Sequence, residues 1–235
     1  MPMENRSYEI EYEFSFEGER KKTFKVVLDP ETITIIRKKL KKRPPEWTKL
    51  EHEQCACCPF TKIEHPHCPI ALNIEEVVEE FKSMFSYEDC DVRCTTPERT
   101  YLKKTSLMEG LSSIFGIIMA TSGCPVMDVF KPMARFHLPF STAQETVMRS
   151  TSMYLLRQYF EHKNDKPPDL DLRLLDAHYD GVRAVNEGFM ARINRLVEKD
   201  ADKNALNILN SYAQMLSMQI HYSLNSLEYL FQPRS

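Results

Sequence analysis

The stretch YEIEYEFSF, residues 8–16, decides the fold class, because large apolar side chains occupy every second position. Strict alternation of this kind is typical of a β-strand with one buried and one solvated face. Segments 24–28 and 32–36 follow after turn signals, so the sequence predicts a three-stranded meander in the first 37 residues. Segment 91–104 carries Thr96-Pro97-Glu98 at its middle and predicts a hairpin that extends the same antiparallel sheet.

Capping signals predict the helices. Ser106 with Glu109 matches the capping box, in which a hydroxyl and a carboxylate satisfy the first free amides of a helix. Gly123 is suited to end that helix in a left-handed conformation. Further helices are predicted to begin at Asn73, Pro125 and Ser141.

The last third of the chain has a different pattern. After Pro167-Pro168, apolar residues recur at alternating spacings of three and four through 172–196 and again through 206–230. Two such helices joined by a short polar break are expected to form an antiparallel hairpin. The predicted architecture is α+β: an N-terminal antiparallel β-sheet with a metal-knuckle loop, packed on a helical cluster that ends in this hairpin. We expect residues 1–166 and 167–235 to pack as one unit.

A cluster of cysteines and histidines lies between residues 52 and 68, with seven such residues among 17. Cys55 and Cys58 have the two-residue spacing that lets two thiolates from one tight loop reach one ion, and Cys68 follows after a return loop. Tetrahedral zinc takes four ligands of this kind, and a closed set is usually structural.

The fourth ligand is open among three residues. Cys124 is favoured because Cys-Pro occurs at Cys58, Cys68 and Cys124, and a following proline stiffens the ligand loop without adding an amide donor. His65 and His67 are the alternatives. An iron–sulfur cluster is the alternative cofactor, but the spacing departs from the tight ferredoxin run. Copper(I), haem or no metal are less favoured.

Four segments carry a family resemblance: CACCP (55–59), HCPIALN (67–73), TSGCP (121–125) and MARFHLPF (133–140). With these segments the chain resembles an uncharacterised family of bacterial proteins over about residues 8–160. The resemblance implies a prokaryotic cytosolic protein and implies nothing about its chemistry.

A thiol-based enzyme or redox sensor centred on Cys124 is the main alternative. Placed before Pro125 at a helix start, the thiol is expected to have a lowered pKa and to be reactive. His137 is then the candidate base and Arg135 the candidate anion-binding residue, with Glu109 or Ser122 lining the pocket. No recognisable oxyanion element accompanies them.

Composition excludes several classes of protein. No run is apolar enough to span a membrane, and the N-terminus lacks the features of a signal peptide, so a cytoplasmic location is expected. The basic run 37–43 has no interleaved aromatic residues and the net charge is −3, so nucleic acid is not an expected partner. We expect a non-enzymatic zinc-binding module, with the C-terminal helices available for a protein partner or for self-association.

Overall fold

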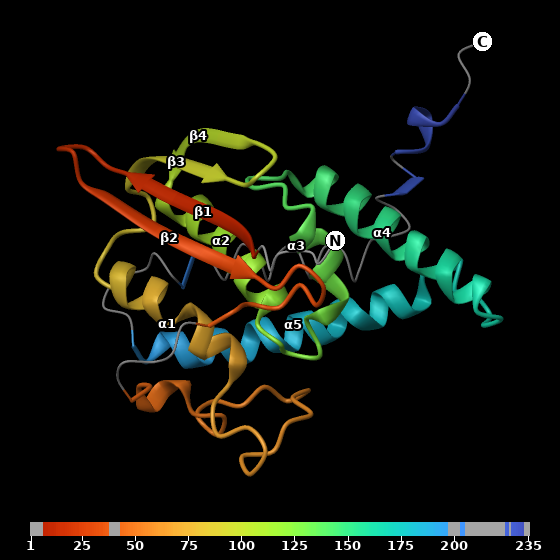
Figure 1. Ribbon diagram of the computed structural model, residues 1–235, viewed down its shortest axis with the longest axis horizontal. Coiled ribbons are helices and arrows are strands. Elements are labelled where there is room, and N and C mark those ends of the chain that lie inside the picture. The colour runs from red at the N-terminus through yellow and green to blue at the C-terminus, as the bar shows by residue number, and fades with distance from the viewer. Residues whose placement is uncertain (1–6, 38–42, 197–202, 205–223, 226, 233–235) are drawn as a thin grey trace, which may run out of the picture.

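A computed structural model of the chain describes residues 7–37, 43–196, 203–204, 224–225 and 227–232. Its sheet is antiparallel, with strand order β2-β1-β3-β4 (Figure 1). The strands are β1 (Tyr8–Ser15), β2 (Lys21–Leu28), β3 (Asp89–Thr95) and β4 (Thr100–Ser106). The α+β architecture and the addition of the hairpin to the first strands are therefore confirmed.

The alternation in β1 becomes a two-faced strand. Tyr12 pairs with Phe24 on one side and Cys94 on the other, and all three side chains are buried. The intervening glutamates lie on the outer face, where Glu11 pairs with Lys25 at 3.1 Å. One face of the sheet is thus committed to the core, as the sequence predicts.

The prediction of a third strand in the meander is wrong. Segment 32–36 contributes only an isolated bridge, between Ile35 and Leu28. The Asp29 carboxylate accepts hydrogen bonds from the amides of Glu31 and Thr32, which fixes a tight turn. The amide of Ile35 then donates to the carbonyl of Thr121, whereas the amide of Ile36 donates to the carbonyl of Val27 in β2. The backbone of this segment is therefore shared between a helix end and β2, and it forms no regular strand.

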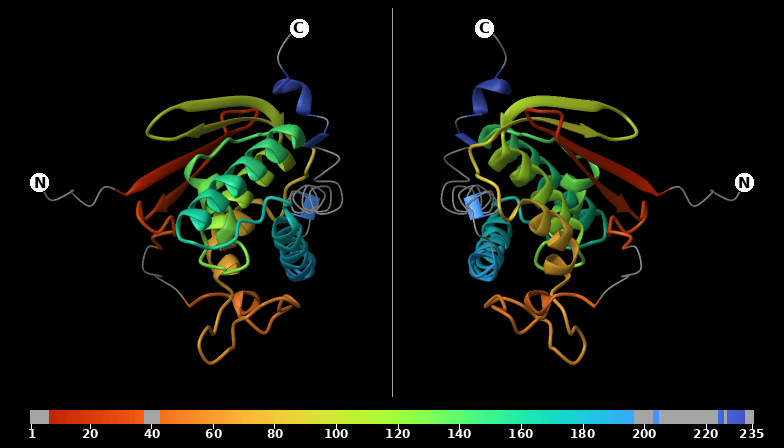
Figure 2. Two further views of the ribbon diagram at one scale, coloured as in Figure 1. Left: turned by 90° about the vertical axis from the view of Figure 1, so that its right-hand side faces the viewer. Right: turned by 90° about the vertical axis from the view of Figure 1, so that its left-hand side faces the viewer.

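The described residues form five α-helices on one side of the sheet, and α5 lies farthest from it (Figure 2). They are α1 (Pro69–Phe81), α2 (Leu107–Thr121), α3 (Lys131–Arg135), α4 (Ala143–Lys163) and α5 (Arg173–Asn194). Short 3-10 turns occur at Glu46–Thr48, Asp128–Phe130 and Glu228–Leu230.

Helix starts agree with the capping signals in part. The Ser106 hydroxyl accepts the Glu109 amide, and Gly123 adopts a φ of 88°, as predicted. Asn73 does not cap α1: the helix begins four residues earlier because Pro69 suits a first turn, and Asn73 donates to the Pro69 carbonyl inside the helix.

Two further helix starts are displaced from their predicted positions. The capping box of α4 is formed by Thr142 with Glu145, one residue after the predicted Ser141. The helix predicted from Pro125 is instead the 3-10 turn Asp128–Phe130 followed by α3.

The core is centred where α1 and α2 cross the inner face of the sheet. Phe81 is fully buried, with its ring centroid 5.1 Å from that of Phe14 and 5.5 Å from that of Phe24. Helix α2 passes close to the strands at Gly110, where a Cβ atom would lie 2.6 Å from Phe14 and 2.9 Å from Val92. Glycine is therefore required at this crossing.

The second helix of the predicted hairpin, 206–230, falls mostly outside the described residues, as does much of the surface expected to bind a partner. The first helix is present as α5. Within the described part of the chain, none of the helices has both the length and the apolar character needed to cross a bilayer.

Candidate functional site

The cysteine loop, residues 47–68, is folded by its own backbone. The Cys58 amide donates to the Cys55 carbonyl at 3.0 Å, which closes the tight turn expected for the two-residue spacing. The Cys68 amide donates to Thr48 at 2.8 Å and so returns the chain to the start of the loop. Cys68 then forms the N-cap of α1. The three predicted ligands of this segment are therefore held on one compact loop.

The loop is seated on α5 at two glycines. A Cβ atom at Gly188 would lie 2.9 Å from the Cys55 sulfur and 3.0 Å from its Cα atom. The Cys57 sulfur lies 3.6 Å from the Gly181 carbonyl oxygen. A side chain at residue 188 would occupy the place of Cys55, so the loop can approach this closely only because that position is glycine. Sequence reasoning missed this contact, although two glycines seven residues apart in a heptad-patterned helix were a signal for it.

The structure brings the four predicted cysteine ligands into electrostatic range of one another. Burial raises the pKa of Cys55 to about 12, and the neighbouring Cys68, Cys57, Cys124 and Cys58 raise it further. Cys124 arrives from the turn after α2, although it is 56 positions beyond Cys68 in the sequence. Without an ion, Cys55 therefore remains a protonated thiol at neutral pH.

Backbone amides face the sulfur of Cys124. Burial raises the pKa of Cys124 to about 11, while hydrogen bonds from the amides of Val126 and Met127 act in the opposite direction, and Cys68 and Cys58 raise it. Amide donors of this kind stabilise a thiolate, whether it is a metal ligand or a nucleophile. The Cys124-Pro125 turn is therefore shaped around the sulfur.

The sulfurs are neighbours without being arranged as ligands. Across the described ranges of the chain, no group of three or more His, Cys, Asp or Glu side chains has the arrangement needed to hold an ion. Of the alternative fourth ligands, the exposed His65 stacks its ring on Phe60 at 3.7 Å, and His67 Nδ1 is hydrogen-bonded to the Thr48 hydroxyl at 2.8 Å, which leaves Nε2 as its possible ligand atom.

A buried arginine lies beside the cysteines. Arg192 of α5 is 1% exposed, and its guanidinium donates to the carbonyls of Trp47, Lys49, Leu50 and Glu53 in the cysteine loop. Burial lowers the pKa of Arg192, and the nearby Cys68, Cys55, Glu53 and Cys58 counteract that effect. None of the ion pairs between described residues includes Arg192. The site therefore contains a desolvated positive charge with carbonyl partners and no carboxylate in contact.

The residues of the thiol-enzyme alternative are not brought together. Arg135 pairs with Glu98 at 3.4 Å and lies over the Tyr8 ring, while His137 is hydrogen-bonded to Tyr12 at 2.5 Å. The expected lowering of the Cys124 pKa is also wrong, because burial outweighs the amide hydrogen bonds. A nucleophile needs an accessible thiolate and a base within hydrogen-bond reach, so this arrangement does not favour catalysis by Cys124.

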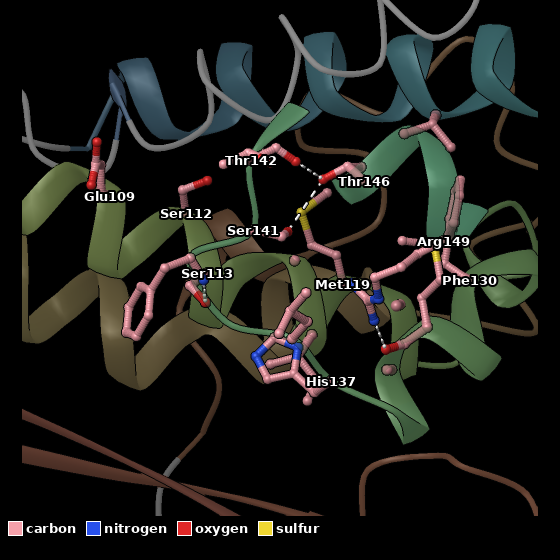
Figure 3. Close-up of a pocket in the computed structure, with 18 of the residues that line it drawn as sticks. Glu109, Ser112, Ser113, Met119, Phe130, His137, Ser141, Thr142, Thr146 and Arg149 are labelled. Atoms are coloured by element: carbon pink, nitrogen blue, oxygen red, sulfur yellow. Dashed lines mark hydrogen bonds between the residues drawn. The ribbon is translucent and has the colours of Figure 1, made fainter. Parts of the chain in front are cut away.

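A separate cavity of about 590 Å³ lies between α2, α3, α4 and α5 (Figure 3). It includes two residues that the sequence associated with a pocket, Glu109 and His137. Cys124 and Arg135 are not among its described lining residues. The cavity and the cysteine cluster are therefore two distinct sites.

Comparison with protein families identifies the chain. A family model described as a domain of unknown function (DUF6901) matches residues 10–232. The chain belongs to the DUF6901 family. Comparison with curated proteins and with solved structures found no match. The DUF6901 match includes the cysteine loop, the turn at Cys124 and helix α5, and it confirms the expectation of an uncharacterised family.

The remaining two cysteines of this DUF6901 domain belong to the core. Cys90 and Cys94 lie on the inner face of β3, 3% and 0% exposed. Burial raises the pKa of Cys90 to about 12 and that of Cys94 to about 11. Both therefore behave as small apolar side chains.

The DUF6901 domain is expected to lose stability on acidification through His137. Burial, followed by the Arg149 guanidinium, lowers the pKa of His137 to about 3. In the unfolded chain a histidine titrates at a pKa of about 6.5. Below about pH 6.5 the unfolded chain binds a proton at His137 and the folded chain does not. The contribution of neutral His137 to the free energy of unfolding is therefore complete above about pH 6.5 and is lost as the pH falls toward 3.

The measurement is urea unfolding between pH 4.5 and 7.5, for the wild type and for His137→Gln, whose side chain stays neutral. The pH dependence of the wild-type unfolding free energy is expected to be steeper by up to about 1.4 kcal/mol per pH unit, the value for one proton. Parallel pH profiles for the two proteins would contradict the assignment.

Proposed function

We propose that the chain is a non-enzymatic metal-binding protein in which Cys55, Cys58, Cys68 and Cys124 hold one structural zinc ion. The observation that carries this proposal is a buried guanidinium, Arg192, within electrostatic range of Cys68, Cys55 and Cys58 and in ion-pair contact with no carboxylate of a described residue. An uncompensated buried charge is costly, so a nearby negative charge is expected.

Four thiolates around one Zn²⁺ carry a net charge of −2, and such a centre needs positive charge close to it when it is buried. Arg192 supplies one such charge within electrostatic range of three of the four sulfurs. The Val126 and Met127 amides supply partial positive charge at the fourth, Cys124. Hydrogen bonds and charges around the ligands are the usual way in which a protein stabilises a metal–thiolate centre.

A zinc ion at this place would link three parts of the fold. Cys55 and Cys58 belong to the loop seated on α5, Cys68 caps α1, and Cys124 follows α2. Binding requires the four thiols to release protons and close on the ion at about 2.3 Å. Since the ligands come from separate elements, the free energy of metal binding would add to the stability of their packing.

Elemental analysis of freshly purified protein tests the proposal. We expect about one zinc per chain and no visible colour. Cys124→Ser is expected to abolish stoichiometric zinc binding and to remove the stabilisation that zinc gives, about 2.7 kcal/mol when free zinc is 100 times its Kd.

Cys57→Ser is the matched control, because Cys57 lies between two ligands and contacts Gly181 instead. It should retain zinc and its stabilising effect. If the protein instead contains iron and absorbs visible light, the four-cysteine site is assigned to an iron–sulfur cluster rather than to zinc. Protein that binds neither metal, and whose stability zinc does not change, would contradict the proposal.

The same chemistry supports a cytoplasmic location. Seven cysteines, none of them in a disulfide, suit a reducing compartment, where thiolates remain available to a metal.

A further inference from the structure

The cavity between α2, α3, α4 and α5 has walls and a size suited to a small molecule. Its volume of about 590 Å³ is within the usual range of ligand pockets. Much of the wall is apolar, and Phe130 contributes to it together with four methionines, Met108, Met119, Met127 and Met133. Methionine side chains adapt to irregular apolar shapes, so these walls suit a hydrocarbon or aromatic body without polar groups.

One polar group in the wall is a guanidinium without a carboxylate partner. Arg149 donates through one nitrogen, Nη2, to the carbonyls of Met133 at 3.0 Å and Phe136 at 2.7 Å. No other hydrogen bond and no ion pair joins it to a described residue. Its remaining N–H donors are therefore available in a partly desolvated place. Burial lowers the pKa of Arg149, and the nearby Tyr101, Glu145 and Tyr179 counteract that effect.

His137 adds a second polar group to the wall, within electrostatic range of Arg149. Its Nε2 is held by the buried Tyr12 hydroxyl, which also contacts the Ser113 hydroxyl at 2.7 Å. The Phe140 amide donates to Ser113 at 3.3 Å. When the Ser113 hydroxyl donates its hydrogen bond to the Tyr12 oxygen and the Tyr12 hydroxyl donates to Nε2, the neutral ring carries its proton on Nδ1, which is then a donor.

The other charges of the cavity cancel. Lys103 and Glu109 form an ion pair at 3.1 Å, and Glu109 lies at the opposite end of the cavity from Arg149 (Figure 3). Among the described lining residues, Arg149 is left as a single net positive charge. We propose that this cavity binds an apolar monocarboxylate, with the carboxylate on Arg149 and His137 and the apolar body against the methionine wall. A planar carboxylate matches the fork of guanidinium donors, and one negative charge matches one positive charge.

Three probes with the same tail test this assignment: decanoate, decanol and decylamine, each titrated below its aggregation concentration into the full-length protein by calorimetry. Decanoate is expected to bind at least about tenfold more tightly than decanol, because a charge-assisted hydrogen bond is lost in the alcohol. Decylamine is expected to bind more weakly than decanol, because its ammonium group is repelled by Arg149.

Arg149→Gln removes the charge and should weaken decanoate binding by about tenfold or more, to the level of decanol. Decanol binding by the same variant shows whether the cavity is still formed, since Arg149 also ties Met133 and Phe136. Arg157→Gln, an exposed residue of the same helix, is the matched control and should bind all three probes as the wild type does. Equal affinity for the three probes, no binding of any of them, or an unchanged preference for decanoate in Arg149→Gln would each overturn the proposal.

Discussion

Replacing Arg192 with methionine is expected to lower the free energy of unfolding by about 3–5 kcal/mol. Methionine preserves much of the apolar stem and removes the guanidinium. The carbonyls of Trp47, Lys49, Leu50 and Glu53 then lose their donor inside the protein, where water cannot replace it fully. The cysteine loop would also lose the contact that fixes its first half on α5.

Equilibrium unfolding in urea measures this change. Arg195→Met is the matched control: it lies one helical turn further along, and its side chain is 68% exposed in an ion pair with Glu53. A surface pair of this kind contributes at most about 1 kcal/mol. Arg192→Lys should be intermediate, because an ammonium cannot reach all four carbonyls. Equal losses for the residue 192 and residue 195 variants would show that the buried guanidinium is not the cause.

Phe81→Ala is expected to cost about 3–5 kcal/mol of unfolding free energy, the usual range for removing a buried aromatic side chain. Phe81 is completely buried, and its ring contacts those of Phe14, Phe16 and Phe24. It is the residue of α1 that fills the space between this helix and the sheet. The loss includes a cavity that neighbouring strands, held by their hydrogen bonds, cannot collapse to fill.

The control for this prediction is Leu102→Ala, on the outer face of β4, where the side chain is 64% exposed. It should change stability by less than about 0.5 kcal/mol. Thermal and urea unfolding of both variants supply the comparison. A loss below about 1 kcal/mol for Phe81→Ala would mean that α1 does not depend on this aromatic contact.

Local patterns predicted the four strands of the sheet and the start of α2. The alternation in residues 8–16 places one face of β1 in the core whatever the partner strands are, and the Ser106 cap depends only on residues three positions apart. Segment 32–36 was mispredicted because its fate is decided at a distance: the Ile35 amide is taken by the carbonyl of Thr121. A competing partner 86 positions away leaves no trace in the local pattern.

The candidate site divides in the same way. Repetition of Cys-Pro pointed to Cys124 as a companion of the loop cysteines, and the fold places them within electrostatic range of one another. Arg192 and Arg149 were not anticipated, because an arginine on an amphipathic helix looks the same in sequence whether it is solvated or buried. Their roles depend on carbonyls supplied by other elements.

The contacts of Arg192 also determine when, during synthesis of the chain, the cysteine loop can pack on α5. The carbonyls that it binds precede it by 139 to 145 positions. At a ribosomal speed of about 5–20 residues per second, Arg192 is synthesised on the order of 7–30 s after the loop residues whose carbonyls it binds. During that interval Cys55, Cys57 and Cys58 lack the helix that later covers them. Oxidants and chaperones in the cell therefore meet these thiols before α5 partly covers them.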